Sequence, residues 1–159
     1  MEKFGQMKLK TYSKKEFIED LQSRNINDDT VESINEYFIC IDSSGGPEST
    51  PYFKKDHTNV IHEAFDDVKE DMKKWGPDIQ RYFYGIAITE QQAFNLAQFI
   101  KKIPADSTIN IHCIKGRYRS HAIRDFIKEV ILDEETIWKG DTECGYYRIR
   151  RLLKEQWIS

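Results

Sequence analysis

The segment INIHCIKGRYRSHAI, residues 109–123, decides the fold because three patterns meet in it. Residues 109–113 form an apolar run that predicts a buried strand ending at Cys113. Residues 119–132 carry apolar side chains at helical spacing. A short loop with Gly116 and several cations joins the two. A strand that passes through a tight loop into a helix is the repeating unit of α/β folds.

The segments on either side repeat this alternation. Strands are predicted over residues 7–12, 36–42, 59–65 and 107–113. Helices are predicted over residues 13–25, 89–103, 119–132 and 143–159, with Ser13 and Thr89 as N-caps. Residues 68–88 fit neither pattern and are expected to be an irregular insertion or a lid. The alternation predicts one α/β domain over residues 1–159, with a central, mainly parallel sheet flanked by helices.

Composition sets the bounds on function. The chain has 159 residues, of which 39% are hydrophobic and 13% aromatic, which indicates a globular domain. Its net charge of −3 gives no general attraction to nucleic acid, and no apolar run approaches the length of a membrane span. Three cysteines without a CxxC pair, and a start without a secretory apolar core, predict a cytoplasmic protein. The sequence does not indicate an oligomeric state.

The loop after Cys113 has the chemistry of an anion site. In open α/β sheets, ligands bind beyond the carboxyl ends of the strands, where backbone N–H groups and a helix N-terminus attract anions. Thiols in such surroundings ionise readily, so we expect Cys113 to be a nucleophilic thiolate. Gly116 permits a tight turn, and the planar guanidinium of Arg119 suits two phosphoryl oxygens. Ser120 is placed to donate a hydrogen bond to the sulfur.

Residues 112–120, HCIKGRYRS, resemble the active-site signature of the cysteine-dependent protein tyrosine and dual-specificity phosphatases, His-Cys-x-x-Gly-x-x-Arg-Ser/Thr. The short chain is more similar to the compact dual-specificity branch. The resemblance implies a phosphocysteine intermediate on Cys113, with neither a metal nor a cofactor. It also implies that His112 and Ser120 tune the thiolate. The phosphate loop that it implies consists of Ile114, Lys115, Gly116, Arg117, Tyr118 and Arg119.

The resemblance also implies an aspartate that protonates the leaving group. Asp67 is the preferred candidate, because AFDD directly follows a predicted strand and is similar to the Phe-Asp-Asp of one phosphatase group. Asp66 beside it is an alternative. Asp78 in KKWGPD is another, because that motif is similar to the Trp-Pro-Asp loop of larger tyrosine phosphatases. Choosing Asp67 requires an insertion between the acid and the helix that follows.

Cys40 lies in the predicted strand FICID. In some members of the resembled family, a second cysteine there forms a reversible disulfide with the nucleophile, which makes Cys40 a candidate redox partner of Cys113. A buried core cysteine is the alternative. His57, His62 and His121 have no partners at metal-ligand spacing, so no metal site is predicted.

Several functions remain open at this point. The leading prediction is a phosphatase acting on phosphotyrosine, phosphoserine or phosphothreonine of proteins. Lys115 and Arg117 replace residues that are commonly small in the family, which favours a multiply charged substrate such as a phosphoinositide or an RNA 5′-phosphate. The alternative is that both cations face solvent or pair with Asp66 and Asp67. The motif is also compatible with a phosphate-binding module that catalyses little, and with another thiolate enzyme such as a sulfurtransferase or arsenate reductase.

Overall fold

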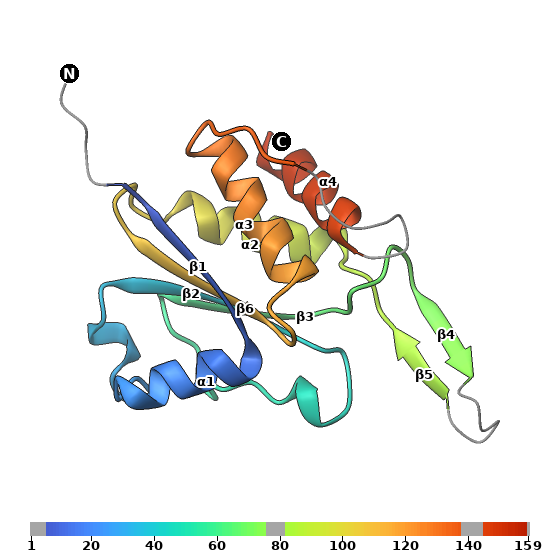
Figure 1. Cartoon of the computed structure of the whole chain (residues 1–159), viewed down its shortest axis with the longest axis horizontal. Coiled ribbons are helices and arrows are strands. Elements are labelled where there is room, and N and C mark those ends of the chain that lie inside the picture. Colours follow the sequence, from blue (N-terminus) through green and yellow to red (C-terminus); the bar gives the residue numbers. More distant parts are fainter. Residues whose placement is uncertain (1–5, 76–81, 138–144, 159) are drawn as a thin grey trace.

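Four parallel strands form the central sheet of the computed structural model, which describes residues 6–75, 82–137 and 145–158 (Figure 1). In spatial order the strands are β1 (Lys8–Ser13), β6 (Thr108–Cys113), β2 (Glu36–Asp42) and β3 (Val60–Ala64). Every pairing in this sheet is parallel, so all four carboxyl ends lie at one edge. The predicted α/β fold with a parallel central sheet is confirmed.

Helices cover both faces of the sheet. The α1 helix (Lys14–Ser23) packs on one face, and α2 (Glu90–Lys101), α3 (Tyr118–Val130) and α4 (Tyr146–Trp157) pack on the other (Figure 1). Alternate side chains of each strand therefore enter two different cores. Phe38 and Cys40 pack in the α1 core, whereas Ile39 and Ile41 pack in the larger core under the other three helices. Burial on both faces explains why β2 and β6 are nearly continuous apolar runs.

Both predicted N-caps form complete capping boxes. The Ser13 side chain accepts a hydrogen bond from the Glu16 backbone N–H, and the Glu16 side chain accepts one from the Ser13 N–H. Thr89 and Gln92 make the same reciprocal pair at the start of α2. Each box satisfies backbone donors that a helix start otherwise leaves without partners. Ser13 thus fixes the point at which β1 turns into α1.

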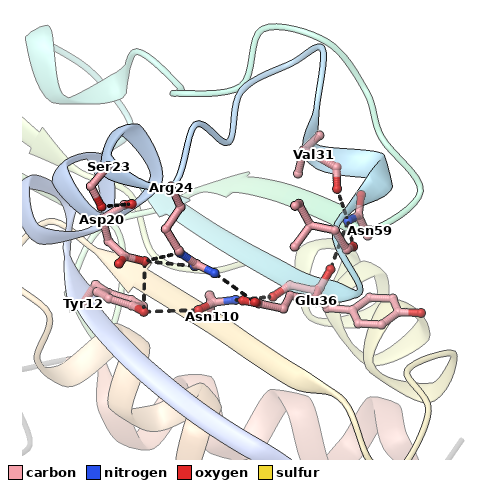
Figure 2. A network of polar contacts seen from close by, with 10 residues as sticks. Tyr12, Asp20, Ser23, Arg24, Val31, Glu36, Asn59 and Asn110 are labelled. Atoms are coloured by element: carbon pink, nitrogen blue, oxygen red, sulfur yellow. Dashed lines mark hydrogen bonds and ion pairs between the residues drawn. The ribbon is translucent and has the colours of Figure 1, made fainter.

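A polar network ties α1 to the strands beneath it (Figure 2). Asn110, in the central strand β6, donates to Glu36 at 2.8 Å and accepts from the Tyr12 hydroxyl at 3.2 Å. Arg24 bridges Glu36 and Asp20, each at 2.9 Å. Burial, followed by the charge of Asp20, raises the pKa of Tyr12 to about 12, so its hydroxyl remains a donor. The network holds β1, β2 and β6 in register at the side of the sheet that faces α1.

Residues 68–88, predicted to be irregular, contain a second, two-stranded sheet. The strands β4 (Met72–Trp75) and β5 (Tyr82–Gly85) pair antiparallel and project away from the main sheet (Figure 1). Both ends of this excursion are fixed, because the Ile86 N–H donates to Asp66 at 2.8 Å and the Ala87 N–H donates to Asp71 at 2.9 Å. The excursion accounts for the extra chain between Asp67 and α2.

Two short 3-10 helices, Val31–Ser33 and Pro47–Ser49, complete the described elements. Within the described ranges, no helix combines the length and the apolar character needed to cross a bilayer.

Candidate active site

Loops from three parallel strands converge on one pocket at the carboxyl edge of the sheet. Ser43 follows β2, Asp67 follows β3, and Cys113 ends β6. The pocket has a volume of about 380 Å³, and the residues that line it are Ser43, Glu48, Asp67, Cys113, Ile114, Lys115, Arg117, Tyr118 and Arg119. The structure therefore brings the predicted nucleophile, the predicted arginine and the preferred acid to one cavity.

The phosphate loop, residues 114–119, rests on the end of β1. Gly116 has a φ of +68°, and a Cβ at this position would lie 2.5 Å from the Ser13 nitrogen and 2.7 Å from the Tyr12 carbonyl carbon. The loop is also hydrogen-bonded to this support, because the Lys14 N–H donates to the Ile114 carbonyl at 3.1 Å. Glycine is required at residue 116 both for its backbone angle and for this close approach.

We expect Gly116→Ala to lower the free energy of unfolding. The positive φ costs about 1–2 kcal/mol with a side chain present, and the clash with the β1 backbone adds to it. Gly46→Ala is the matched control, because Gly46 has a φ of +78° but nothing within 4 Å of an added Cβ. Urea denaturation of both variants measures the difference. A Gly116→Ala variant as stable as the wild type would show that the approach of the loop to β1 is unimportant.

Cys113 is held under the phosphate loop, with 2% of its surface exposed. Its thiol donates to Ser120 Oγ at 3.3 Å, and the Ser120 hydroxyl donates to the Arg117 carbonyl at 3.0 Å. Ser120 lies in the first turn of α3, so the sulfur faces the positive end of that helix dipole. Ser120 and the sulfur are therefore in contact, but the thiol is the donor, whereas the sequence analysis expected Ser120 to donate.

Arg119 connects the phosphate loop to the loop that carries the acids. Its guanidinium is buried and donates from Nη1 to the Phe65 carbonyl at 2.8 Å. The Phe65 N–H donates in turn to the Asp42 carbonyl at the end of β2. Arg119 thus ties the phosphate loop to the segment that carries Asp67, two residues beyond Phe65, and it also lines the pocket.

Asp67 is positioned by the N-terminus of α4. Its Oδ1 accepts from the Gly145 N–H at 2.8 Å, and no residue in the described ranges forms a hydrogen bond with Oδ2. The start of α4 is itself anchored to α3, because the Tyr146 hydroxyl donates to Asp125 at 2.5 Å. Gly145 also lies tight against residue 68, where a Cβ would be 3.2 Å from the Val68 nitrogen. Both α3 and the loop that carries Asp67 are therefore anchored to the start of α4.

The other two candidate acids differ from Asp67. Asp66 does not line the pocket, and its carboxylate accepts from the Ser44 N–H, the Ser44 hydroxyl and the Ile86 N–H. These bonds join the loop after β2 to the base of the β4–β5 excursion. Asp78 lies outside the described residues. Of the candidates within them, Asp67 alone faces the cavity.

His112 is completely buried on the α1 face of β6. Its ring lies 4.4 Å from that of Phe17, centroid to centroid, and neither ring nitrogen has a hydrogen-bond partner among the described residues. Burial lowers the pKa of His112 from 6.5 to about 4, although the Asp42 carboxylate acts in the opposite direction. The imidazole is therefore neutral at pH 7.

This burial predicts a loss of stability in mild acid. The unfolded chain binds a proton on His112 below pH 6.5 that the folded chain binds only below about pH 4. The free energy of unfolding should fall by about 3 kcal/mol across this window as the pH is lowered. His112→Asn should flatten this dependence in urea denaturation at pH 7 and pH 4.5.

His57→Asn is the control for that measurement. A hydrogen bond with Asp28 raises the pKa of His57, so its contribution is present in acid and is lost as the pH rises, the opposite sign. His57→Asn should therefore still lose free energy of unfolding as the pH is lowered, as the wild type does. An unchanged slope in His112→Asn would assign the acid-side loss to other groups.

The structure does not bring Cys40 to Cys113. The strand register pairs Cys40 with His112, so Cys40 points into the α1 core, while Cys113 belongs to the core on the other face. Successive strand residues face opposite sides of a sheet, which separates the two sulfurs. Burial raises the pKa of Cys40 well above its ordinary value, so it is a protonated core thiol.

Sequence reasoning missed one wall of the pocket. Ser43 and Glu48 line it, in the turn SSGGPEST that follows β2. Lys14 holds this wall, because its ammonium binds the buried Asp42 carboxylate at 2.6 Å and the Thr50 carbonyl at 2.5 Å. The only signal in the sequence was that the turn follows a buried strand of a parallel sheet, where ligand loops gather.

Comparisons with protein-family models, with curated proteins and with solved structures give no match to this chain. Among the residues that the structure describes, no group of three or more His, Cys, Asp or Glu side chains could hold a metal ion.

Proposed function

We propose that this protein is a cysteine-dependent phosphatase that hydrolyses phosphate monoesters. The observation that carries the proposal is the meeting of Cys113, Arg119 and Asp67 at one cavity, above a loop that Gly116 allows to close. Each of these residues has the type and the position that one part of phosphoryl transfer requires. The signature HCIKGRYRS is consistent with the same chemistry.

In the first step, the Cys113 thiolate attacks phosphorus and forms an S–P bond as the ester P–O bond breaks. Asp67 transfers its proton from the free Oδ2 to the leaving oxygen, so the product departs as an alcohol. Arg119 and the backbone N–H groups of the loop stabilise the charge on the three phosphoryl oxygens. The Ser120 hydroxyl turns from the Arg117 carbonyl to the sulfur when the thiol ionises.

In the second step, a water molecule attacks the phosphocysteine. The Asp67 carboxylate, deprotonated by the first step, takes a proton from this water as the new O–P bond forms. The S–P bond breaks and returns the electron pair to Cys113, where the hydrogen bond from Ser120 stabilises the thiolate. Inorganic phosphate leaves, and Asp67 again holds the proton that the next turnover requires.

Phosphorylated protein side chains are the substrates that we propose first, and phosphoinositides or RNA 5′-phosphates are the non-protein alternatives. A thiolate nucleophile requires reducing surroundings, which supports an intracellular location.

Hydrolysis of p-nitrophenyl phosphate tests the activity, with reductant present and a chelator in place of any metal. We expect turnover that vanadate inhibits, because vanadate takes the five-coordinate geometry of the phosphoryl transition state. Absence of turnover together with tight binding of vanadate would replace the enzyme with a phosphate-binding module. Absence of both would reject the site.

A further inference from the structure

A groove runs along one side of α4 and shares no lining residue with the active-site pocket. We call it the α4 groove. Its volume is about 550 Å³, and the residues that line it are Lys69, Tyr147, Arg148, Arg151, Lys154, Glu155 and Ile158. All of these except Lys69 recur at intervals of three or four along α4 and its C-cap, so they form one stripe on the helix. The buried residues of α4, such as Ile149 and Leu153, lie on the other side.

Cations dominate the lining of the α4 groove. Lysine and arginine supply four of its seven residues, against 24 of 159 in the whole chain, whose net charge is −3. Two of the four cations have carboxylate partners, because Arg151 binds Glu155 at 3.2 Å and Lys154 binds Glu129 at 2.5 Å. These pairs lie at the surface, where ion pairs contribute little, so a further carboxylate can approach both cations.

Arg148 is held in the α4 groove by neutral acceptors. Its Nε donates to the Ile88 carbonyl at 2.9 Å, and its Nη1 donates to the Lys69 carbonyl at 3.4 Å. Among the residues that the structure describes, no carboxylate forms an ion pair with this guanidinium. Arg148 therefore presents its charge in an orientation that is already fixed, which lowers the entropic cost of binding an anion.

The two ends of the α4 groove are apolar. Tyr147 lies at one end and is 37% exposed, and Ile158 lies at the other and is 84% exposed. Because an α-helix rises 1.5 Å per residue, these ends are about 16 Å apart, roughly the length of five extended residues. A small anion would fill only part of this length. An extended peptide would contact the cations and the apolar ends together.

We propose that the α4 groove binds an acidic segment of a partner protein, with apolar residues of that segment resting on Tyr147 and Ile158. Complementary charge selects an acidic chain. Glu155 and Glu129 disfavour a nucleic acid, because a strand with a phosphate at every nucleotide would meet these carboxylates, whereas a peptide can place an uncharged residue opposite them. The inference concerns binding and is independent of the proposed phosphatase function.

Fluorescence anisotropy with labelled peptides measures this binding. In the first peptide, a leucine and a phenylalanine are flanked by aspartates and glutamates. The second has asparagine and glutamine in place of the acids, and the third has serine in place of the two apolar residues. The proteins are the wild type, Arg151→Gln/Lys154→Gln, Ile158→Ser and the control Lys8→Gln/Lys15→Gln. The control removes the same net charge from exposed lysines outside the groove.

We expect Arg151→Gln/Lys154→Gln to bind the first peptide roughly tenfold more weakly than the wild type, because two charge contacts are lost and Glu155 and Glu129 then repel the peptide. The control should stay within about twofold of the wild type. Ile158→Ser should weaken binding of the first peptide roughly threefold and leave the third unchanged. Binding to the wild type should also weaken at about 1 M salt, where the Debye length is about 3 Å.

Glu155→Gln gives an expected result of opposite sign. It removes a carboxylate from the lining, so the first peptide should bind more tightly than to the wild type, a gain that misfolding cannot produce. The inference is overturned if the first peptide does not bind the wild type, if it binds no better than the second, or if the control loses as much as Arg151→Gln/Lys154→Gln. Tighter binding of a single-stranded oligonucleotide or of phosphatidylserine vesicles would also overturn it, because the groove would then have a different occupant.

Discussion

Cys113→Ser should reduce hydrolysis of p-nitrophenyl phosphate by roughly 10³-fold or more, the scale on which nucleophile substitutions act. The serine hydroxyl stays protonated at neutral pH and no general base lies against it, because the neighbouring Ser120 is itself a hydroxyl. The variant should still bind vanadate and phosphate, since the loop N–H groups and Arg119 are unchanged. Steady-state kinetics and calorimetry on the same preparation separate turnover from binding.

Cys40→Ala is the matched control, because Cys40 is also buried but lies in the core on the other face of the sheet. It should lose some stability and keep most of its turnover. If Cys40→Ala were as inactive as Cys113→Ser, the loss would reflect damage to the fold. If Cys113→Ser kept its activity, the phosphocysteine mechanism would be wrong.

Asp67→Asn should slow hydrolysis of phenyl phosphate by about 10²-fold, at the lower end of what general acids contribute. The effect on p-nitrophenyl phosphate should be smaller, because p-nitrophenolate is stable enough to leave without a proton. If a general acid protonates the leaving group, we expect kcat/KM of the wild type to fall at high pH. Asp67→Asn should lack this fall in kcat/KM at high pH, the basic limb of the pH profile. A pH series with phenyl phosphate measures it.

Asp66→Asn and Asp78→Asn are the comparisons for this assignment. Asp66→Asn weakens the bonds to Ser44 and the Ile86 N–H, so it should lower stability while the basic limb remains. If Asp78→Asn instead removes the limb, the acid belongs to that residue and the enzyme class is retained. Retention of the limb in all three variants would mean that none of these aspartates is the acid.

The local sequence predicts most of the main fold. Strand and helix positions follow from apolar periodicity, and the capping boxes at Ser13 and Thr89 form as their sequences indicate. Strand order does not follow in this way. The central place of β6, between β1 and β2, depends on pairings between distant segments. The β4–β5 pair was missed, and it does not join the main sheet.

In the candidate site too, the sequence predicts contacts between neighbouring residues and does not predict contacts between distant segments. Cys113, Gly116 and Arg119 are close in sequence, so the motif predicts their meeting. The choice between Asp66 and Asp67 depends on which side chain faces the cavity, and Gly145, from a distant helix, decides it. The separation of Cys40 from Cys113 depends on strand register. The wall formed by Ser43 and Glu48 has no chemical motif to reveal it.

The support that β1 gives to Gly116 has a consequence for biosynthesis. Lys8 pairs with Thr108, and the phosphate loop rests on the Tyr12–Ser13 backbone, so β1 waits for a strand that is made 100 residues later. Closing so long a loop is entropically slow, and such contacts set the pace of folding. The loop over Cys113 is therefore completed only after β6 has been made and has paired with β1. Under the proposed function, a nascent chain that lacks β6 cannot act on phosphoesters, and the appearance of turnover during translation would time this pairing.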